Sequence, residues 1–132
     1  MTQASDVAGV IRRFYEAIAA GDIDAVERLS SDDDGAVAIG TDPEEWWEGG
    51  RTIKAALREY VAEAQHRIKP GRPRIGRSGD VAWFADRPAL VMAGGQEVPC
   101  RLTGVLRHED GEWRIVQSHT SIGVPNAEAF GF

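Results

Sequence analysis

The stretch EVPCRLTGVLRHEDGEWRIVQSHTS, residues 97–121, decides the fold, because it has the pattern of two long strands joined by a tight turn. Apolar and polar residues alternate over residues 98–107, as in a strand with one buried face. The Asp110-Gly111 pair between the two strands is typical of a hairpin turn. The sequence therefore predicts a long antiparallel hairpin in this region.

The opening stretch, residues 6–29, has the pattern of two helices instead. Ser5 or Asp6 can cap the first helix, Gly21 ends it, and Asp22 caps a short second helix. Apolar residues recur at helical spacing on one face of the first helix, at Val7, Val10, Ile11, Phe14 and Ile18. These residues are expected to face the sheet.

The middle of the chain adds a third helix and more strands. The helix follows Gly49-Gly50, and its buried stripe is Ile53, Leu57, Tyr60, Val61 and Ala64. Strands are expected in residues 35–40, 73–78 and 80–92, whereas residues 41–50 and 124–132 are expected to be irregular. Residues 1–132 therefore form one α+β domain, in which a curved, mostly antiparallel sheet wraps over three helices as a cone.

Composition excludes several classes of function. The net charge of −6 disfavours nucleic acid, and the basic segment 66–77 has no aromatic residue for base stacking, so it is expected to be a solvated edge strand. The lone Cys100 indicates a reducing, cytoplasmic setting, and neither a signal peptide nor an apolar run of membrane-spanning length is found. His66, His108 and His119 lack metal-ligand spacing, so no metal or other cofactor is expected.

The hairpin turns determine which side chains face inward. A two-residue Gly94-Gly95 turn would pair Arg87 with Leu102 and point Trp83, Ala85 and Arg87 inward. The second turn has two solutions. A two-residue Asp110-Gly111 turn would direct Ile115, Gln117 and His119 inward. A three-residue turn beginning at Glu109, which we favour, would direct Arg114, Val116, Ser118 and Thr120 inward.

Three residues are candidates for chemistry. Arg87, if inward, could bind the carboxylate of a small acid, although it could equally pair with an internal acid. Asp86 becomes an inward general base only if its strand shifts by one residue, and a surface position is the simpler expectation. His119 lies beside Ser118 and Thr120, but under the favoured turn it faces the convex side, where a structural role is expected.

The three apolar stripes converge on a pocket between the helices and the concave sheet, suited to a small apolar or amphipathic, possibly acidic, molecule. The adjacent Trp46 and Trp47 cannot both pack on one surface, so one is expected at the pocket mouth or a subunit contact. The predicted lining is Phe14, Ile18, Trp46, Trp47, Leu57, Tyr60, Trp83, Arg87, Leu102, Leu106, Val116, Ser118 and Thr120. On the convex face, Val105, Trp113 and Ile115 would form an apolar patch and favour a homodimer.

The order of elements resembles the nuclear transport factor 2-like superfamily, also called SnoaL-like or ketosteroid-isomerase-like. The residues that carry the resemblance are 12–29, the Gly49-x-x-x-Ile53 helix entry, GDVAWF (79–84) and DGEWRIVQSHTS (110–121). The resemblance implies a cystatin-like α+β barrel with a cone-shaped pocket, commonly dimeric through the convex sheet face. The superfamily includes isomerases, dehydratases, epoxide hydrolases, polyketide cyclases and non-catalytic association domains.

The resemblance does not extend to the catalytic residues of the steroid isomerases. Their oxyanion tyrosine corresponds to Phe14, with Tyr15 about 100° further round the helix. Their general base corresponds to Ile39 and their protonated acid to Gly104, so the triad is absent. Small-molecule binding is therefore the first expectation. The alternatives are a SnoaL-like enzyme of the cyclase, isomerase or dehydratase type, which would use Arg87, Asp86 or His119, and a dimerisation module.

Overall fold

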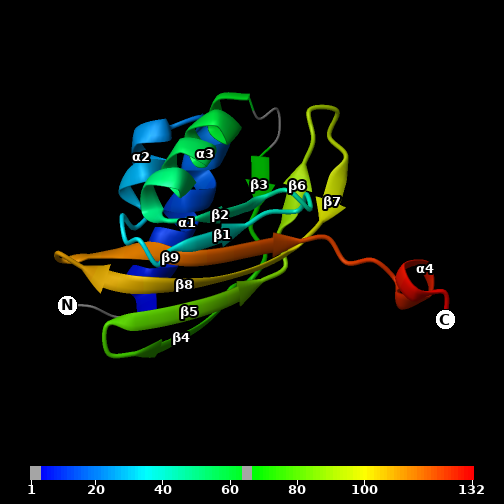
Figure 1. Cartoon of the computed structure of the whole chain (residues 1–132). Helices are drawn as coiled ribbons and strands as arrows, with labels where there is room; N and C mark the ends of the chain where they lie inside the picture. Colours follow the sequence, from blue (N-terminus) through cyan, green and yellow to red (C-terminus); the bar gives the residue numbers. More distant parts are fainter. Residues whose placement is uncertain (1–3, 64–66) are drawn as a thin grey trace.

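A computed structural model describes residues 4–63 and 67–132 of the chain (Figure 1). Ala64 and His66, both considered above, lie outside the described residues. The helices are α1 (Ala4–Ala20), α2 (Ile23–Arg28), α3 (Gly50–Glu63) and α4 (Asn126–Phe130). The strands are β1 (Val37–Ile39), β2 (Trp46–Glu48), β3 (Arg67–Lys69), β4 (Arg74–Ser78), β5 (Val81–Asp86), β6 (Ala89–Val91), β7 (Glu97–Pro99), β8 (Arg101–Glu109) and β9 (Glu112–Ser121).

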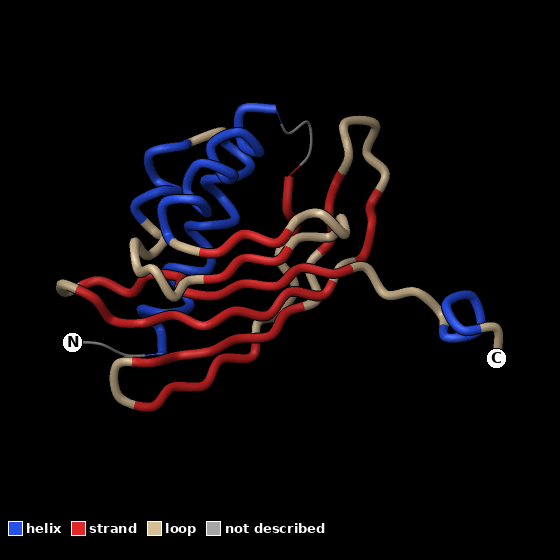
Figure 2. Tube along the Cα trace, in the orientation of Figure 1, coloured by secondary structure: helices blue, strands red, loops and turns tan. Residues whose placement is uncertain are grey.

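The strands form a large curved sheet and a small one. The large sheet has the order β2-β1-β9-β8-β5-β4 and is antiparallel except for the parallel pair β1–β9. The small sheet has the order β3-β6-β7. Helices α1, α2 and α3 gather over one side of the large sheet, while α4 stands away from the body (Figures 1 and 2). The predicted α+β class is confirmed.

Local chemistry accounts for the start of α2. The side chain of Asp22 accepts a hydrogen bond from the amide of Ala25 at 3.1 Å and caps α2, as predicted. Ser5 and Asp6, expected as caps, instead lie inside α1. The predicted loop 41–50 contains β2, and the tail that was expected to be irregular contains α4. The basic strands β3 and β4 each occupy a sheet edge, as predicted for this segment.

The predicted register of β5 is wrong by one residue. Val91 pairs with Glu97 rather than Val98, because the turn contains three residues, Ala93 to Gly95, instead of two. Asp86 therefore pairs with Leu102 on the inner face, together with Ala82 and Phe84. Trp83, Ala85 and Arg87, all predicted to point inward, face outward, and 49% of the Trp83 surface is exposed.

The β8–β9 hairpin combines features of both predicted turns. Asp110 and Gly111 form a two-residue turn, with φ of 49° and 83°, so the three-residue turn that the sequence favoured is wrong. The register then shifts between Val105 and Leu106, because β9 contains one extra residue, Val116. Ser118 and Thr120 consequently face inward opposite Gly104 and Leu102, in agreement with the favoured face.

The predicted convex apolar patch is partly wrong. Trp113 is buried, with its ring 5.2 Å from that of His108, and Ile115 packs against the core. Both residues precede the extra residue of β9, and so they face the helices. The apolar side chains that do face outward on β5 and β8 are Val81, Trp83, Ala85 and Val105.

Among the described residues the core divides into three clusters. The largest packs α1 against β5, β8 and Trp113; the second joins α1, α2 and α3; and the third joins β1 to α3. Phe14 and Ile68 each contact the first and second clusters, and Leu57 contacts the second and third. These three side chains are only partly buried and lie where the clusters meet.

Candidate functional site

The concave face of the sheet brings the inward polar residues into two neighbouring rows. Asp86, Leu102 and Thr120 lie side by side across β5, β8 and β9. Phe84, Gly104 and Ser118 form the next row. Because adjacent strands are about 4.8 Å apart, the backbones at Asp86 and Thr120 are separated by roughly 10 Å, and Leu102 lies between them. An apolar floor therefore separates an acid from two hydroxyls.

Asp86 is buried, and its carboxylate accepts three hydrogen bonds. Oδ2 accepts hydrogen bonds from the Tyr15 hydroxyl at 2.9 Å and from the Gly71 amide at 3.1 Å, while Oδ1 accepts one from the Arg87 amide at 2.7 Å. Burial, reinforced by the hydrogen bond to Asp86 and its charge, raises the pKa of Tyr15. This arrangement ties α1 and the loop before β4 to β5.

Unlike Asp86, Ser118 and Thr120 have side chains that lack hydrogen-bond partners among the residues that the structure describes. Both side chains are half-buried on the inner face of β9, near the Trp47, Leu57 and Val116 side of the cone. Neither hydroxyl forms a hydrogen bond with any group in the described part of the chain. Because each hydroxyl can both donate and accept, these two inner-face groups could form hydrogen bonds with a ligand.

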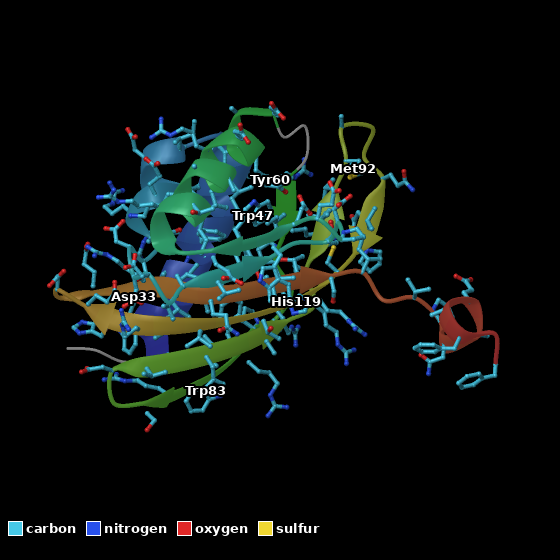
Figure 3. The ribbon with its side chains drawn as sticks, viewed as in Figure 1. Asp33, Trp47, Tyr60, Trp83, Met92 and His119 are labelled. Carbon is cyan, nitrogen blue, oxygen red and sulfur yellow. The ribbon has the colours of Figure 1, made fainter. Side chains whose placement is uncertain are left out.

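Tyr60 and Trp47 lie at the α3 side of the interior (Figure 3). Burial, followed by the charges of Glu45 and Cys100, raises the pKa of Tyr60 to about 12. Tyr60 belongs to α3, Glu45 to the turn before β2, and Cys100 to the junction between β7 and β8. Segments that are distant in the sequence therefore meet around Tyr60. Trp47 pairs with Ala38 and packs inward, whereas its neighbour Trp46 points outward and is 59% exposed.

The remaining predicted site residues have other surroundings. Ile18 and Leu106 are buried inside the packed clusters, and Leu106 is 0% exposed. Trp83 projects from the outer face, as Figure 3 shows, and His119 lies exposed opposite Thr103, as predicted. Arg87 is exposed and lines a surface groove at the end of the sheet. Of the three catalytic candidates, only Asp86 faces the interior.

Tyr15 is an inward-facing polar residue that the sequence-based prediction of the site does not include. It lies four residues after Ile11 and eight after Val7, so it shares their helix face and is 2% exposed. This spacing could have identified it as an inward residue. Its partner Asp86 lies 71 positions away, and no local pattern connects the two.

The described residues hold no group of three metal-ligating side chains that could bind an ion. None of the helices in this same part of the chain has the length and apolar character that crossing a bilayer requires.

Comparison with known proteins agrees with this architecture. The SnoaL-like domain matches residues 7–125. The chain belongs to the SnoaL-like domain family. Among curated proteins, none matches the sequence significantly.

Solved structures share the fold of this SnoaL-like chain at low sequence identity. An NTF2-like protein of unknown function from Pseudomonas putida KT2440 has 18% identity and a TM-score of 0.80, covering 95% of this chain and 91% of its own. A proposed dehydratase of the NTF2-like family from Streptomyces avermitilis has 17% identity and a TM-score of 0.80, with coverage of 92% and 96%. A proposed calcium/calmodulin-dependent protein kinase II association domain from Xanthomonas campestris has 22% identity and a TM-score of 0.72, with coverage of 93% and 89%. At these identities the likeness shows the fold alone.

Proposed function

We propose that this SnoaL-like chain binds a small amphipathic molecule inside the cone, with Ser118 and Thr120 as its hydrogen-bonding partners. One observation carries the proposal: two inward, half-buried hydroxyls have no hydrogen-bond partner among the described residues. A sheet face that only had to pack against helices would gain stability from apolar residues at these positions.

The surroundings of the two hydroxyls are apolar. Phe14, Trp47, Leu57 and Val116 are half-buried and lie on the borders of the three core clusters. Partial exposure of inward apolar side chains is what a pocket lining requires, because a filled core would bury them completely. These residues come from α1, β2, α3 and β9, and would contact a ligand from several sides.

We propose a neutral ligand because of the charges near the concave face. Arg87, proposed from the sequence to select anions, faces outward and cannot serve an interior ligand. The inward carboxylate of Asp86 already accepts three hydrogen bonds. A hydroxyl or carbonyl group on an apolar ring system fits Ser118 and Thr120, since each side chain can donate and accept.

A pair of matched probes tests this proposal. Fluorescence titration gives the affinities of 2-naphthol and naphthalene, which differ by one hydroxyl. We expect the preference for 2-naphthol to fall about fivefold in the Ser118→Ala/Thr120→Val variant, the effect of a typical net hydrogen bond. Thr103→Val is the matched control, because Thr103 is exposed on the outer face. An unchanged preference in the double variant would contradict the proposal.

Catalysis is the second candidate, favoured by the inward position of Asp86 in the row of Thr120. Oδ1 accepts only one hydrogen bond, so this oxygen keeps a lone pair with which the carboxylate could abstract a proton next to a carbonyl. Deuterium exchange into 2-tetralone, followed by NMR, measures such a step directly. Exchange above the buffer rate that disappears in Asp86→Asn would favour an enzyme, whereas exchange at the buffer rate in both proteins favours binding alone.

A further inference from the structure

A groove of about 500 Å³ lies at the end of the sheet where β5 and β9 end and β8 begins. Its lining includes Arg87, Val98, Pro99, Arg101, Ile122 and Gly123. We call it the arginine groove. Both arginine side chains are exposed, and among the described residues neither pairs with an acid; Arg101 Nε reaches only Ser121 Oγ, at 3.5 Å. The groove thus combines an apolar floor with two positive charges that the described chain does not neutralise.

Residues 122–132, the C-terminal arm, leave the sheet beside this groove. Figure 1 shows the arm extending from β9 and carrying α4 clear of the body. Four large apolar side chains of the arm are exposed: Ile122 at 45%, Val124 at 56%, Phe130 at 66% and Phe132 at 87%. The Phe130 and Phe132 rings stack on each other, with centroids 5.8 Å apart. Apolar groups exposed together on a projecting segment indicate a surface that another molecule covers.

We propose that the arm of one copy of the chain docks in the arginine groove of a second copy, and that the reciprocal contact closes a two-fold dimer. Complementary charge supports this occupant, because Glu128 is the one charged side chain of the arm and the groove presents Arg87 and Arg101. The stacked phenylalanines would pack on Val98 and Pro99.

The position of the arm explains why such an assembly would stop at two chains. Ile122 and Gly123 belong both to the root of the arm and to the lining of the groove. A two-fold axis beside them would place each arm over the other copy's groove, so the same contact is made twice. Helix α4 also lies beyond residues 7–125, which match the SnoaL-like domain, so the contact is a feature of this chain rather than of the domain.

A charge exchange between two variants tests the proposal. Arg101→Glu leaves Arg87 as the one cation of the groove and places a carboxylate beside it, facing the acidic arm, whereas Glu128→Arg gives a groove and an arm that are both basic. Sedimentation velocity should show a wild-type dimer at micromolar concentration and a dissociation constant about tenfold higher or more for each variant alone. An equimolar mixture should restore the dimer, because both contacts in the mixed pair then join opposite charges.

Control variants distinguish docking of the arm in the arginine groove from other interfaces and from other ligands of the groove. Phe130→Ser should weaken the dimer, yet leave the melting temperature of the monomer unchanged when both proteins are diluted until they are monomeric, because Phe130 is exposed in the single chain. A monomeric wild type would overturn the proposal, as would a mixture that fails to reassociate. The proposal would also fail if both charge variants remained dimeric while Trp83→Glu became monomeric. That result would place the interface on the convex sheet face. Benzoate binding that requires Arg101 in a monomeric protein would assign the groove to a small anion instead.

Discussion

Ile115 and Val116 are neighbours in a β-strand, yet both side chains face the interior. Ile115 packs against the cluster formed by α1 and the sheet, whereas Val116 packs against the cluster of β1 and α3. The extra residue in β9 makes this possible, because it interrupts the usual alternation of side chains. The same interruption places Trp113 in the core near the turn and Ser118 and Thr120 on the concave face beyond it.

This geometry predicts an unusual mutational pattern along β9. Ile115→Asn and Val116→Asn should each lower the free energy of unfolding by about 2 kcal/mol, because each places an amide in an apolar cluster. Gln117→Asn, on the exposed outer face, is the control and should have little effect. Denaturant unfolding measures all three, and a large effect at only one of positions 115 and 116 would contradict the assigned register.

The hydrogen bond between Tyr15 and Asp86 should be energetically significant. Tyr15→Phe removes one donor from a buried carboxylate and should destabilise the protein by about 1.5–3 kcal/mol. The same substitution in an Asp86→Ala background should cost less, because the partner is already gone. The free energies of unfolding of the wild type, the two single variants and the double variant give the coupling energy between Tyr15 and Asp86. A coupling energy near zero would show that the hydrogen bond contributes nothing to stability.

The two tyrosines of the chain should resist ionisation in the folded state. The pKa of Tyr60 is raised from 10.0 to about 12, and that of Tyr15 is also raised. Because the folded chain holds these protons more tightly, their contribution to stability is complete below pH 10 and decreases as pH rises towards 12. Tyrosinate absorbance near pH 11 should therefore be far below that of the unfolded chain, and equal absorbance would contradict the burial.

Gly104 should tolerate no side chain. A Cβ there would lie 2.5 Å from the Phe84 ring and 3.1 Å from the Gln117 carbonyl oxygen. Gly104→Ala should therefore destabilise the chain by about 1–3 kcal/mol through overpacking. Gly94→Ala is the control, because a Cβ at that position would have no other atom within 4 Å. Comparable melting temperatures for the two variants would rule out this close contact.

The sequence predicted the elements better than their registers. Helical spacing located α1, α2 and α3, and strict alternation identified the inner face of β8 from Leu102 to Leu106. Each register, by contrast, depended on the number of residues in one turn. Gly94-Gly95 favoured a two-residue turn where three residues are used, and this single residue exchanged Asp86 for Arg87 at the inner face.

The second hairpin shows why such errors can partly cancel. The turn is one residue shorter than the favoured one, but the extra residue Val116 restores the inward face for Ser118 and Thr120. A bulge of this kind satisfies packing on two helices at once and leaves no local signature in the residues around it. The contact between Tyr15 and Asp86 likewise depends on the tertiary fold, so neither feature was accessible from periodicity.

The location of a bound probe tests the central claim most directly. Intermolecular NOEs can be measured between 2-naphthol and the methyl groups of the isotope-labelled protein. We predict NOEs to Leu57, Val116 and Thr120, which surround the proposed interior site. NOEs confined to the outward Val81 and Val105, or to Val98 and Ile122 of the arginine groove, would contradict an interior binding site.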